Sequence, residues 1–217
     1  MLNRAEYIRY LYRIMRTSPR RYSNLYKTIF EHRCRRMLEI GTYDGIHAAG
    51  MIQTAAIFYP ADKIEYVGVD LFERLTPDKA ETEFAKRPPP ISEAERRLKK
   101  TNARITLYQG DSREVLPREK KDMGIFDFIF IDGGHSGETV SSDWDSARDL
   151  MNENTVVIFD DYYPSAGRPP DNAGCMDVIH SLDRSFYDIE ILQPSDKFVT
   201  KNSALEINFV RVRKKRK

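Results

Sequence analysis

Apolar positions recur along the chain with two spacings, which divide it into helical and extended segments. In residues 4–16 and 22–30 the apolar side chains fall every three or four positions, as one face of a helix requires. Ser18 and Pro19 separate these two segments, because proline cannot continue a helix. Short apolar runs predict strands. They cover residues 37–40, 64–70, 104–109, 127–131, 155–159, 189–192 and 205–212.

The order of these segments predicts an α/β fold. Helical patterns follow the first strand through about residue 59, cover residues 136–151, and return near residues 172–182. Strands that alternate with helices form parallel sheets covered on both faces. Residues 193–204 join the last two strands without a helix, so these should pair antiparallel. We therefore expect a Rossmann-like three-layer sandwich with a mostly parallel seven-stranded sheet, an antiparallel C-terminal hairpin and an N-terminal helical cap.

A long, charged connection covers residues 73–103, between the second and third strands. Three prolines at 88–90 cannot lie inside a helix, so a helix is expected on either side of them. Two interpretations stay open: a lid or interaction insert, and a solvated pair of helices. The chain length of 217 residues suits one domain. Its expected parts are a helical cap at 1–36, the main domain at 37–212 and a basic tail at 213–217.

Charge is unevenly distributed, although the formal net charge is only +2. Residues 1–36 contain ten Lys and Arg, residues 211–217 contain six, and the body between them is strongly acidic. An acidic body argues against a nucleic-acid-binding surface on this part of the chain. Contact of the basic ends with RNA, anionic lipid or an acidic partner stays open as an alternative to solvation.

Other features of the composition favour the cytoplasm. Cys34 and Cys175 are far apart, which favours reduced thiols over a disulfide. No apolar run approaches the roughly 20 residues that span a bilayer, and no secretory apolar region is visible at the N-terminus. An Arg-rich start would also suit an organelle transit segment, but the apolar stripe continues into the first strand without a linker. Homodimerisation stays open.

Acidic residues stand at the carboxyl ends of most predicted strands. These ends line one crevice in a parallel sheet, so the carboxylates should converge there. Unless a ligand or a metal supplies cations or donors, they repel one another and raise one another's pKa. Scattered helix caps would explain one or two such acids but not all of them. The acids are Glu39 within the first strand, and Asp70, Asp111, Asp132, Asp160 and Asp161 after the next four.

Two motifs resemble those of class I S-adenosylmethionine-dependent methyltransferases, over roughly residues 37–212. Residues 38–45, LEIGTYDG, resemble motif I of that family. Residues 130–135, FIDGGH, followed by Asp143 and by Asp160-Asp161, resemble a small-molecule methyltransferase subgroup. Its pattern is roughly Ile-Asp-Gly-x-His and later Asp-Asp. This second match is the more specific, because a glycine loop after a strand is common.

The chain departs from the family pattern at two places. Residues 152–154, Asn-Glu-Asn, replace the usual Gly-Gly turn, and Gly137 stands where an aromatic residue is often found. A nucleotide-cofactor dehydrogenase would share the acid at Asp70. It would also require a middle glycine that the loop at 41–45 lacks, and the terminal hairpin argues against it as well.

The resemblance implies S-adenosylmethionine as the cofactor. Asp70 would accept hydrogen bonds from both ribose hydroxyls, and Asp111 would accept one from the adenine amine. Glu39 would lie near the ammonium group, and Gly41 would leave room for the methionine part. The full implied cofactor set is Glu39, Gly41, Thr42, Tyr43, Gly45, Asp70, Leu71, Asp111, Ser112 and Asp132.

Methyl transfer from a sulfonium requires an aligned acceptor and a group that takes its proton. His135 is the expected general base, because the unperturbed pKa of histidine lies near neutrality. Asp132 is the second catalytic candidate. Tyr162 and Tyr163 are expected to line the acceptor pocket. The histidines expected to be structural or superficial are His32, His47 and His180.

A metal ion is a further hypothesis. Asp132, Asp160 and Asp161 resemble the metal-binding trio of the catechol O-methyltransferase type, with His135 at the position of that family's lysine base. Three carboxylates would suit Mg²⁺ completed by waters and a substrate diol. A metal-free interpretation stays open, in which His135 works alone and Asp160 and Asp161 bind substrate or cap a helix.

The sequence therefore predicts a methyltransferase (EC 2.1.1.-) that acts on a small hydroxylated acceptor, O-methylation first. One alternative is a cofactor-binding but inactive scaffold. Another is an RNA methyltransferase whose basic ends contact the phosphate backbone. No aromatic stacking platform or acceptor-base motif supports the RNA alternative.

Overall fold

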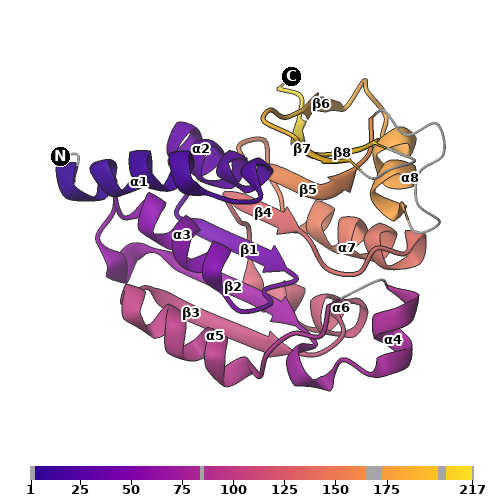
Figure 1. The fold of residues 1–217 in the computed structure, drawn as a ribbon, viewed down its shortest axis with the longest axis horizontal. Helices are drawn as coiled ribbons and strands as arrows, with labels where there is room; N and C mark the ends of the chain where they lie inside the picture. The colour runs from indigo at the N-terminus through magenta and orange to yellow at the C-terminus, as the bar shows by residue number, and fades with distance from the viewer. Residues whose placement is uncertain (1–2, 84–85, 165–172, 200–203, 217) are drawn as a thin grey trace.

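A mostly parallel sheet runs through the computed structural model, which describes residues 3–83, 86–164, 173–199 and 204–216 (Figure 1). Its strand order is β3-β2-β1-β4-β5-β8-β6, and β7 pairs with β8 alone. Strands β1 to β5 are parallel, whereas β6 and β7 run antiparallel to β8, as β8 does to β5. The strands are β1 (Arg36–Ile40), β2 (Glu65–Asp70), β3 (Arg104–Gln109), β4 (Phe128–Ile131), β5 (Val156–Tyr162), β6 (Tyr187–Ile191), β7 (Asp196–Val199) and β8 (Ala204–Lys214).

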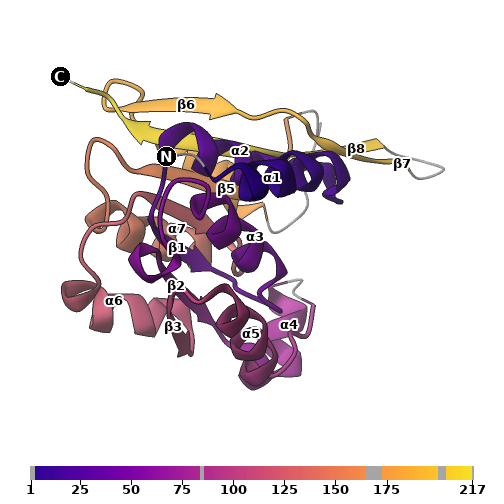
Figure 2. The ribbon, with the colours of Figure 1, turned by 90° about the vertical axis from the view of Figure 1, so that its left-hand side faces the viewer.

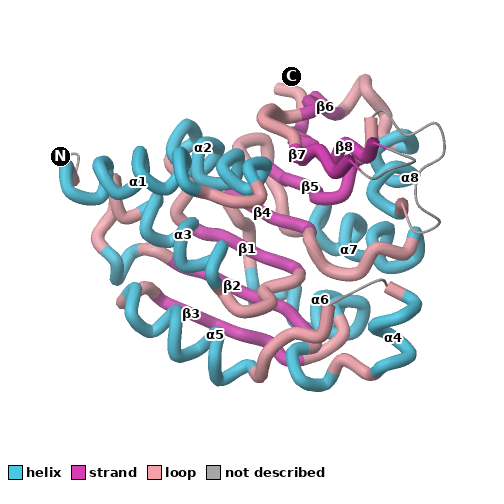
Figure 3. The backbone as a smooth tube through the Cα atoms, in the orientation of Figure 1, coloured by secondary structure: helices cyan, strands magenta, loops and turns pink. Residues whose placement is uncertain are grey.

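Helices cover both faces of the sheet (Figure 3). One face carries α1 (Arg4–Arg16), α2 (Ser23–His32), α3 (Ile46–Ala55) and α5 (Ile91–Leu98). The other face carries α6 (Ser112–Met123), α7 (Gly137–Asp149) and α8 (Gly174–Ser181). Helix α4 (Pro77–Thr82) lies beyond the carboxyl ends of β2 and β3. Short 3₁₀ turns are η1 (Arg20–Tyr22), η2 (Ala61–Lys63), η3 (Phe72–Arg74) and η4 (Lys99–Thr101).

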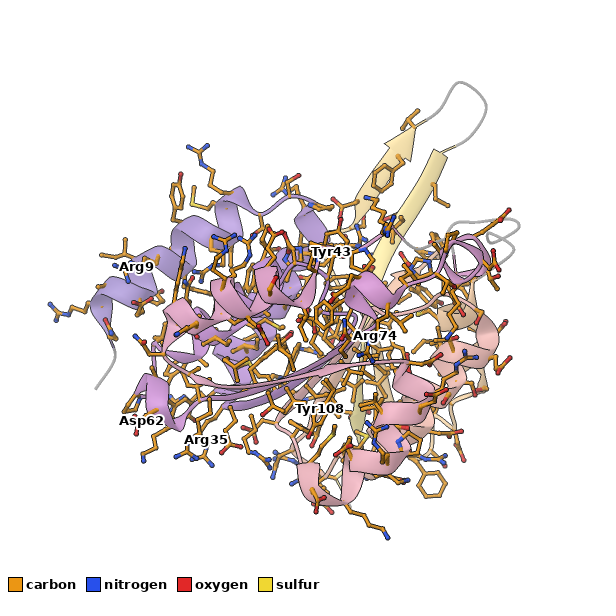
Figure 4. All side chains as sticks on the ribbon, turned by 90° about the horizontal axis from the view of Figure 1, so that it is seen from below. Arg9, Arg35, Tyr43, Asp62, Arg74 and Tyr108 are labelled. Carbon is orange, nitrogen blue, oxygen red and sulfur yellow. The ribbon has the colours of Figure 1, made fainter. Side chains whose placement is uncertain are left out.

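Side chains fill the space on both sides of the sheet (Figure 4), and the central strands contribute to a buried cluster on each face. In β4, Phe128 and Phe130 pack in the cluster that contains α1, α2 and α3. Ile129 and Ile131 pack in the cluster that contains α6 and α7. All four residues are buried, which is why the strand is apolar at every position.

The predicted α/β sandwich, parallel sheet, terminal antiparallel pair and helices on both sides of the prolines are confirmed. Three local differences stand out. The segment 193–204 was expected to be a loop, but residues 196–199 form β7. Helix α6 was not predicted, because its exposed face is almost entirely charged. Strand β5 continues past Phe159, with a register shift between Phe159 and Tyr162.

The β7–β8 hairpin projects beyond the body of the molecule (Figure 2). Its base touches the N-terminal turn η1, where the backbone N–H groups of Arg20 and Arg21 donate to the carboxylate of Asp196 at 2.7 Å and 3.0 Å. Segments far apart in the sequence therefore meet near the end of β5. None of the described helices is long and apolar enough to cross a membrane.

Candidate active site

The loop between β1 and α3 is pressed against the end of β4. Gly41 has a φ of +94°, and a Cβ built there would lie 1.9 Å from the carbonyl oxygen of Asp132. Only glycine fits this contact, because it has no Cβ and tolerates positive φ. Gly45, with a φ of +74°, directly precedes α3. The predicted glycine loop is therefore in place at the carboxyl edge of the sheet.

Asp70 holds this loop to the end of β2. Its Oδ2 accepts a hydrogen bond from the Tyr43 backbone N–H at 2.7 Å, and its Oδ1 accepts one from Phe72 at 2.7 Å. Leu71 is the residue between Asp70 and Phe72 in the sequence. Burial raises the pKa of Asp70 even though the backbone donors lower it. A carboxylate has about four lone-pair sites, so capacity remains for a ligand's hydroxyls.

Glu39 lies beneath the same loop and is almost completely buried, at 2% exposed. It accepts a hydrogen bond from the Tyr66 hydroxyl, which also lies 3.2 Å from the Thr42 hydroxyl. Burial raises the pKa of Glu39 to about 8. The site therefore contains a carboxyl group that a nearby cationic ligand group would help to ionise.

The raised pKa of Glu39 predicts a pH dependence of stability. The folded protein keeps a proton that the unfolded chain releases at its ordinary pKa of about 4.3. Stability from this proton is complete below the unfolded pKa and is lost as the pH rises to about 8. Glu39→Gln should flatten unfolding free energies measured across this window, and exposed Glu153→Gln should not. Parallel pH profiles for wild type and Glu39→Gln would contradict the assignment.

Asp111 caps the N-terminus of α6 at the end of β3. It accepts hydrogen bonds from Arg113 Nη2 at 2.8 Å and from Lys79 Nζ at 2.7 Å. Arg113 and Lys79 hold the pKa of this carboxyl well below its usual range. The predicted adenine acceptor is thus ionised, and α4 reaches across to contact it.

The other end of the α4 segment contacts the loop after β4. Glu83 accepts hydrogen bonds from the Ser136 backbone N–H at 2.8 Å and the Thr139 hydroxyl at 2.7 Å. Behind this loop, burial raises the pKa of Asp143 to about 7, and neither of its carboxylate oxygens has a hydrogen-bond partner among the described residues. Part of the segment 73–103 therefore borders the site, and its role as a lid stays a prediction.

The His135 and Asp161 side chains pair at the carboxyl edge of β4 and β5. His135 Nε2 lies 2.9 Å from Asp161 Oδ2. Burial lowers the pKa of the imidazole, but Asp161 outweighs this effect and raises it overall. Asp161 has a φ of +59°, within the irregular end of β5. This left-handed conformation separates its side chain from the contacts made by Asp160, and it costs energy in a residue other than glycine.

Asp132 and Asp160 instead meet two residues of the N-terminal turn η1. The Tyr22 hydroxyl lies 3.0 Å from Asp132 Oδ2 and 3.1 Å from Asp160 Oδ2. Arg21 donates from Nε to Asp160 Oδ1 at 2.7 Å and from Nη2 to Asp160 Oδ2 at 2.9 Å. Both carboxylates are buried, which raises their pKa values, while Arg21 opposes the rise.

These contacts do not fit the predicted magnesium site. Both oxygens of Asp160 are bonded to Arg21, and Asp161 is paired with His135. The described parts of the chain contain no group of three or more His, Cys, Asp or Glu residues arranged to hold a metal ion. The metal prediction for Asp132, Asp160 and Asp161 is therefore not supported by the arrangement of these side chains.

A small pocket opens between β4, β5 and α8. Its lining includes Asp132, Gly133, His135, Asp160, Asp161 and Cys175. Burial and the nearby charge of Asp161 raise the pKa of the Tyr163 hydroxyl. Tyr162 instead packs in the core, with its hydroxyl 3.4 Å from His180 Nε2. The structure places Tyr163, but not Tyr162, beside the ionisable groups.

Arg21 and Tyr22 were not predicted as site residues, because they lie in the expected helical cap. Arg21 is one of ten basic residues in the first 36, and nothing local distinguishes it from the others. His47 was expected to be structural, and its ring stacks on Tyr22 with 3.9 Å between centroids. Burial lowers the pKa of His47 to about 4, so its ring supports Tyr22 as a neutral group.

Comparison with known proteins identifies the family of the chain. A family model described as a methyltransferase domain matches residues 38–162, more than half of the chain. The chain therefore belongs to the methyltransferase-domain family, as the sequence motifs predicted. The match covers both the glycine loop and the Asp160-Asp161 pair. A search of curated proteins found no match.

Solved structures of methyltransferases share the fold. An O-methyltransferase from Bacillus cereus, solved with SAH, has a TM-score of 0.60 at 18% identity and covers 92% of this chain and 82% of its own. The O-methyltransferase TomG from Streptomyces achromogenes, in complex with SAM, has a TM-score of 0.59 at 19% identity, with 91% and 80% covered. The SAH-bound methyltransferase PaMTH1 from Podospora anserina has a TM-score of 0.58 at 18% identity, with 99% and 89% covered.

Proposed function

We propose that this protein transfers a methyl group from S-adenosylmethionine to a hydroxyl group of a small acceptor. The observation that carries the proposal is the His135–Asp161 pair, 2.9 Å apart, in a pocket that also includes Asp132. Membership of the methyltransferase-domain family supports it. Two structural neighbours are named as O-methyltransferases and were solved with SAM or SAH, which supports the choice of cofactor and acceptor atom.

The residues at the carboxyl edge fit this cofactor. Glu39 and Asp132 are buried carboxyl groups whose pKa values burial raises, and a ligand with an ammonium and a sulfonium group would stabilise their charged forms. Asp70 would hold the ribose, and Asp111 would face the adenine amine. When bound, the cofactor supplies a methyl group on an electrophilic sulfur, which an oxygen nucleophile can displace in line.

His135 would remove the proton of the acceptor hydroxyl. Because Asp161 accepts from Nε2, Nδ1 keeps the lone pair that takes the proton. Asp161 then stabilises the imidazolium ion that forms, as a carboxylate does for the base in other proton-transfer sites. The surrounding strand ends keep these groups in a partly buried pocket, where electrostatic interactions are stronger than in water.

Calorimetry tests the cofactor assignment directly. Titration of S-adenosylmethionine into the EDTA-treated protein should give saturable heat. Asp70→Asn should weaken binding by about 10-fold to 100-fold, because charge-assisted hydrogen bonds contribute about 1.5–3 kcal/mol. Asp62→Asn, which changes an exposed acid elsewhere, is the matched control. No heat with a folded wild-type protein would contradict the proposed function.

A further inference from the structure

A fixed cation is built into the acidic end of the sheet. The Arg21 guanidinium forms two parallel hydrogen bonds with Asp160, whose Oδ2 also shares the Tyr22 hydroxyl with Asp132. We infer that Arg21 takes the place of a divalent cation between Asp132 and Asp160, so that this methyltransferase needs no metal. The inference rests on the proposed function for its catalytic meaning, but the Arg21 contacts stand independently of it.

Burial and contacts with several elements fix the position of Arg21. The residue is only 7% exposed. Its Cζ lies 5.6 Å from the centre of the Phe209 ring, and its Nη1 donates to Asp196 Oδ2 at 3.2 Å. The backbone N–H of Arg21 also donates to Asp196. Three elements, η1, β7 and β8, thus hold one guanidinium against the end of β5.

The charges explain why this buried arrangement is stable. Two adjacent buried carboxylates repel each other, and each would otherwise be driven towards its neutral form. A guanidinium stays charged at every relevant pH and matches a carboxylate in a two-pronged geometry. A divalent ion at the same place would have to displace Arg21 from both oxygens of Asp160, and would lie beside a buried positive charge.

Arg21 is therefore a positioning residue. It fixes Asp160 through two hydrogen bonds, and the Tyr22 hydroxyl, which lies within hydrogen-bond distance of both carboxylates, links Asp160 to Asp132. Arg21 forms no hydrogen bond or ion pair with His135, whose partner is Asp161. Because Arg21 pairs with Asp160 and not with Asp161, the His135–Asp161 pair is free for proton transfer, while Arg21 neutralises charge at Asp132 and Asp160. An acceptor would then be aligned by the pocket and His135, without chelation to a metal.

Manganese binding tests this inference without any need for cofactor or acceptor. Mn²⁺ would be titrated into the full chain after treatment with EDTA and dialysis, and followed by electron paramagnetic resonance. The wild type should show no saturable site. Arg21→Ala should create one, with an apparent affinity at least about tenfold above any residual Mn²⁺ binding by the wild type. It should also lower the melting temperature, and Mn²⁺ should restore it.

Control variants show whether a change in Mn²⁺ binding is specific to Arg21 and Asp160. Arg20→Ala removes the same charge from the exposed neighbouring residue and should behave as the wild type does. Adding Asp160→Asn to Arg21→Ala should abolish the new site. If Arg21→Ala does not fold, Arg21→Met keeps the buried volume and carries the same titration. Stoichiometric Mn²⁺ binding to the wild type that Asp160→Asn abolishes would overturn the inference, as would a folded Arg21 variant without gained affinity. Failure of the proposed function would appear instead as absent S-adenosylmethionine binding.

Discussion

Replacing His135 with alanine is expected to lower kcat by about 10²-fold to 10⁴-fold, the usual contribution of a positioned general base. Affinity for S-adenosylmethionine should change little, because His135 contacts Asp161 and none of the residues assigned to the cofactor. Single-turnover rates and calorimetry on the same preparation separate the two effects. His180→Ala, an exposed histidine beside Tyr162, is the control.

The pH profile gives a second measure of the same residue. Asp161 raises the pKa of His135, so the wild-type rate should increase with pH around a midpoint above about 6.5, the ordinary value for histidine. Asp161→Asn removes that charge and should move the midpoint to lower pH while also lowering the maximal rate. An unchanged kcat in folded His135→Ala would exclude His135 as the base.

Gly41→Ala is expected to cause the largest loss of cofactor affinity, by at least about 100-fold, because displacements of about 1 Å can cost that factor. A Cβ at this position would lie 1.9 Å from the Asp132 carbonyl oxygen, in a residue whose φ is +94°. The loop after β1 would have to move away from β4, taking with it the contact between Tyr43 and Asp70. Calorimetry with S-adenosylmethionine measures the loss.

A glycine in a relaxed position provides the comparison for this substitution. Gly137 begins α7, and a Cβ there would meet only Asp177 Oδ2, at 3.6 Å. Gly137→Ala should therefore leave both cofactor affinity and melting temperature close to those of the wild type. Gly41→Ala should lower the melting temperature by several degrees. Retained affinity in Gly41→Ala would show that the loop is not part of the cofactor site.

The architecture was predictable where burial imposes a regular pattern. Phe128–Ile131 is apolar at every position because the strand is covered on both faces. Helix α6 escaped prediction because its charged residues obscure a narrow apolar stripe. Strand β7 escaped because residues 196–199 are mostly exposed and are held by pairing with β8, a contact that no local pattern reveals.

The candidate site was predictable in composition but not in pairing. The topology brings the acids after β2 to β5 to one edge, as expected from a parallel sheet. The different partners of Asp160 and Asp161 could not be predicted, because Asp161 is a left-handed residue within an irregular strand end. Nor could the partner of Asp160 be predicted, since Arg21 lies 139 residues earlier in the chain.

The positions of Arg21, Asp160 and Asp196 in the sequence also set the order in which the ribosome synthesises them. Arg21 precedes Asp160 by 139 residues and Asp196 by 175. At roughly 5–20 residues per second, the ribosome produces Asp196 about 9–35 s after Arg21. During this interval the guanidinium lacks Asp196, and it lacks Asp160 as well until that residue has been made. A nascent chain interrupted before β7 therefore lacks Asp196, so Arg21 Nη1 and the backbone N–H groups of Arg20 and Arg21 have no native acceptor, which distinguishes it from the finished protein.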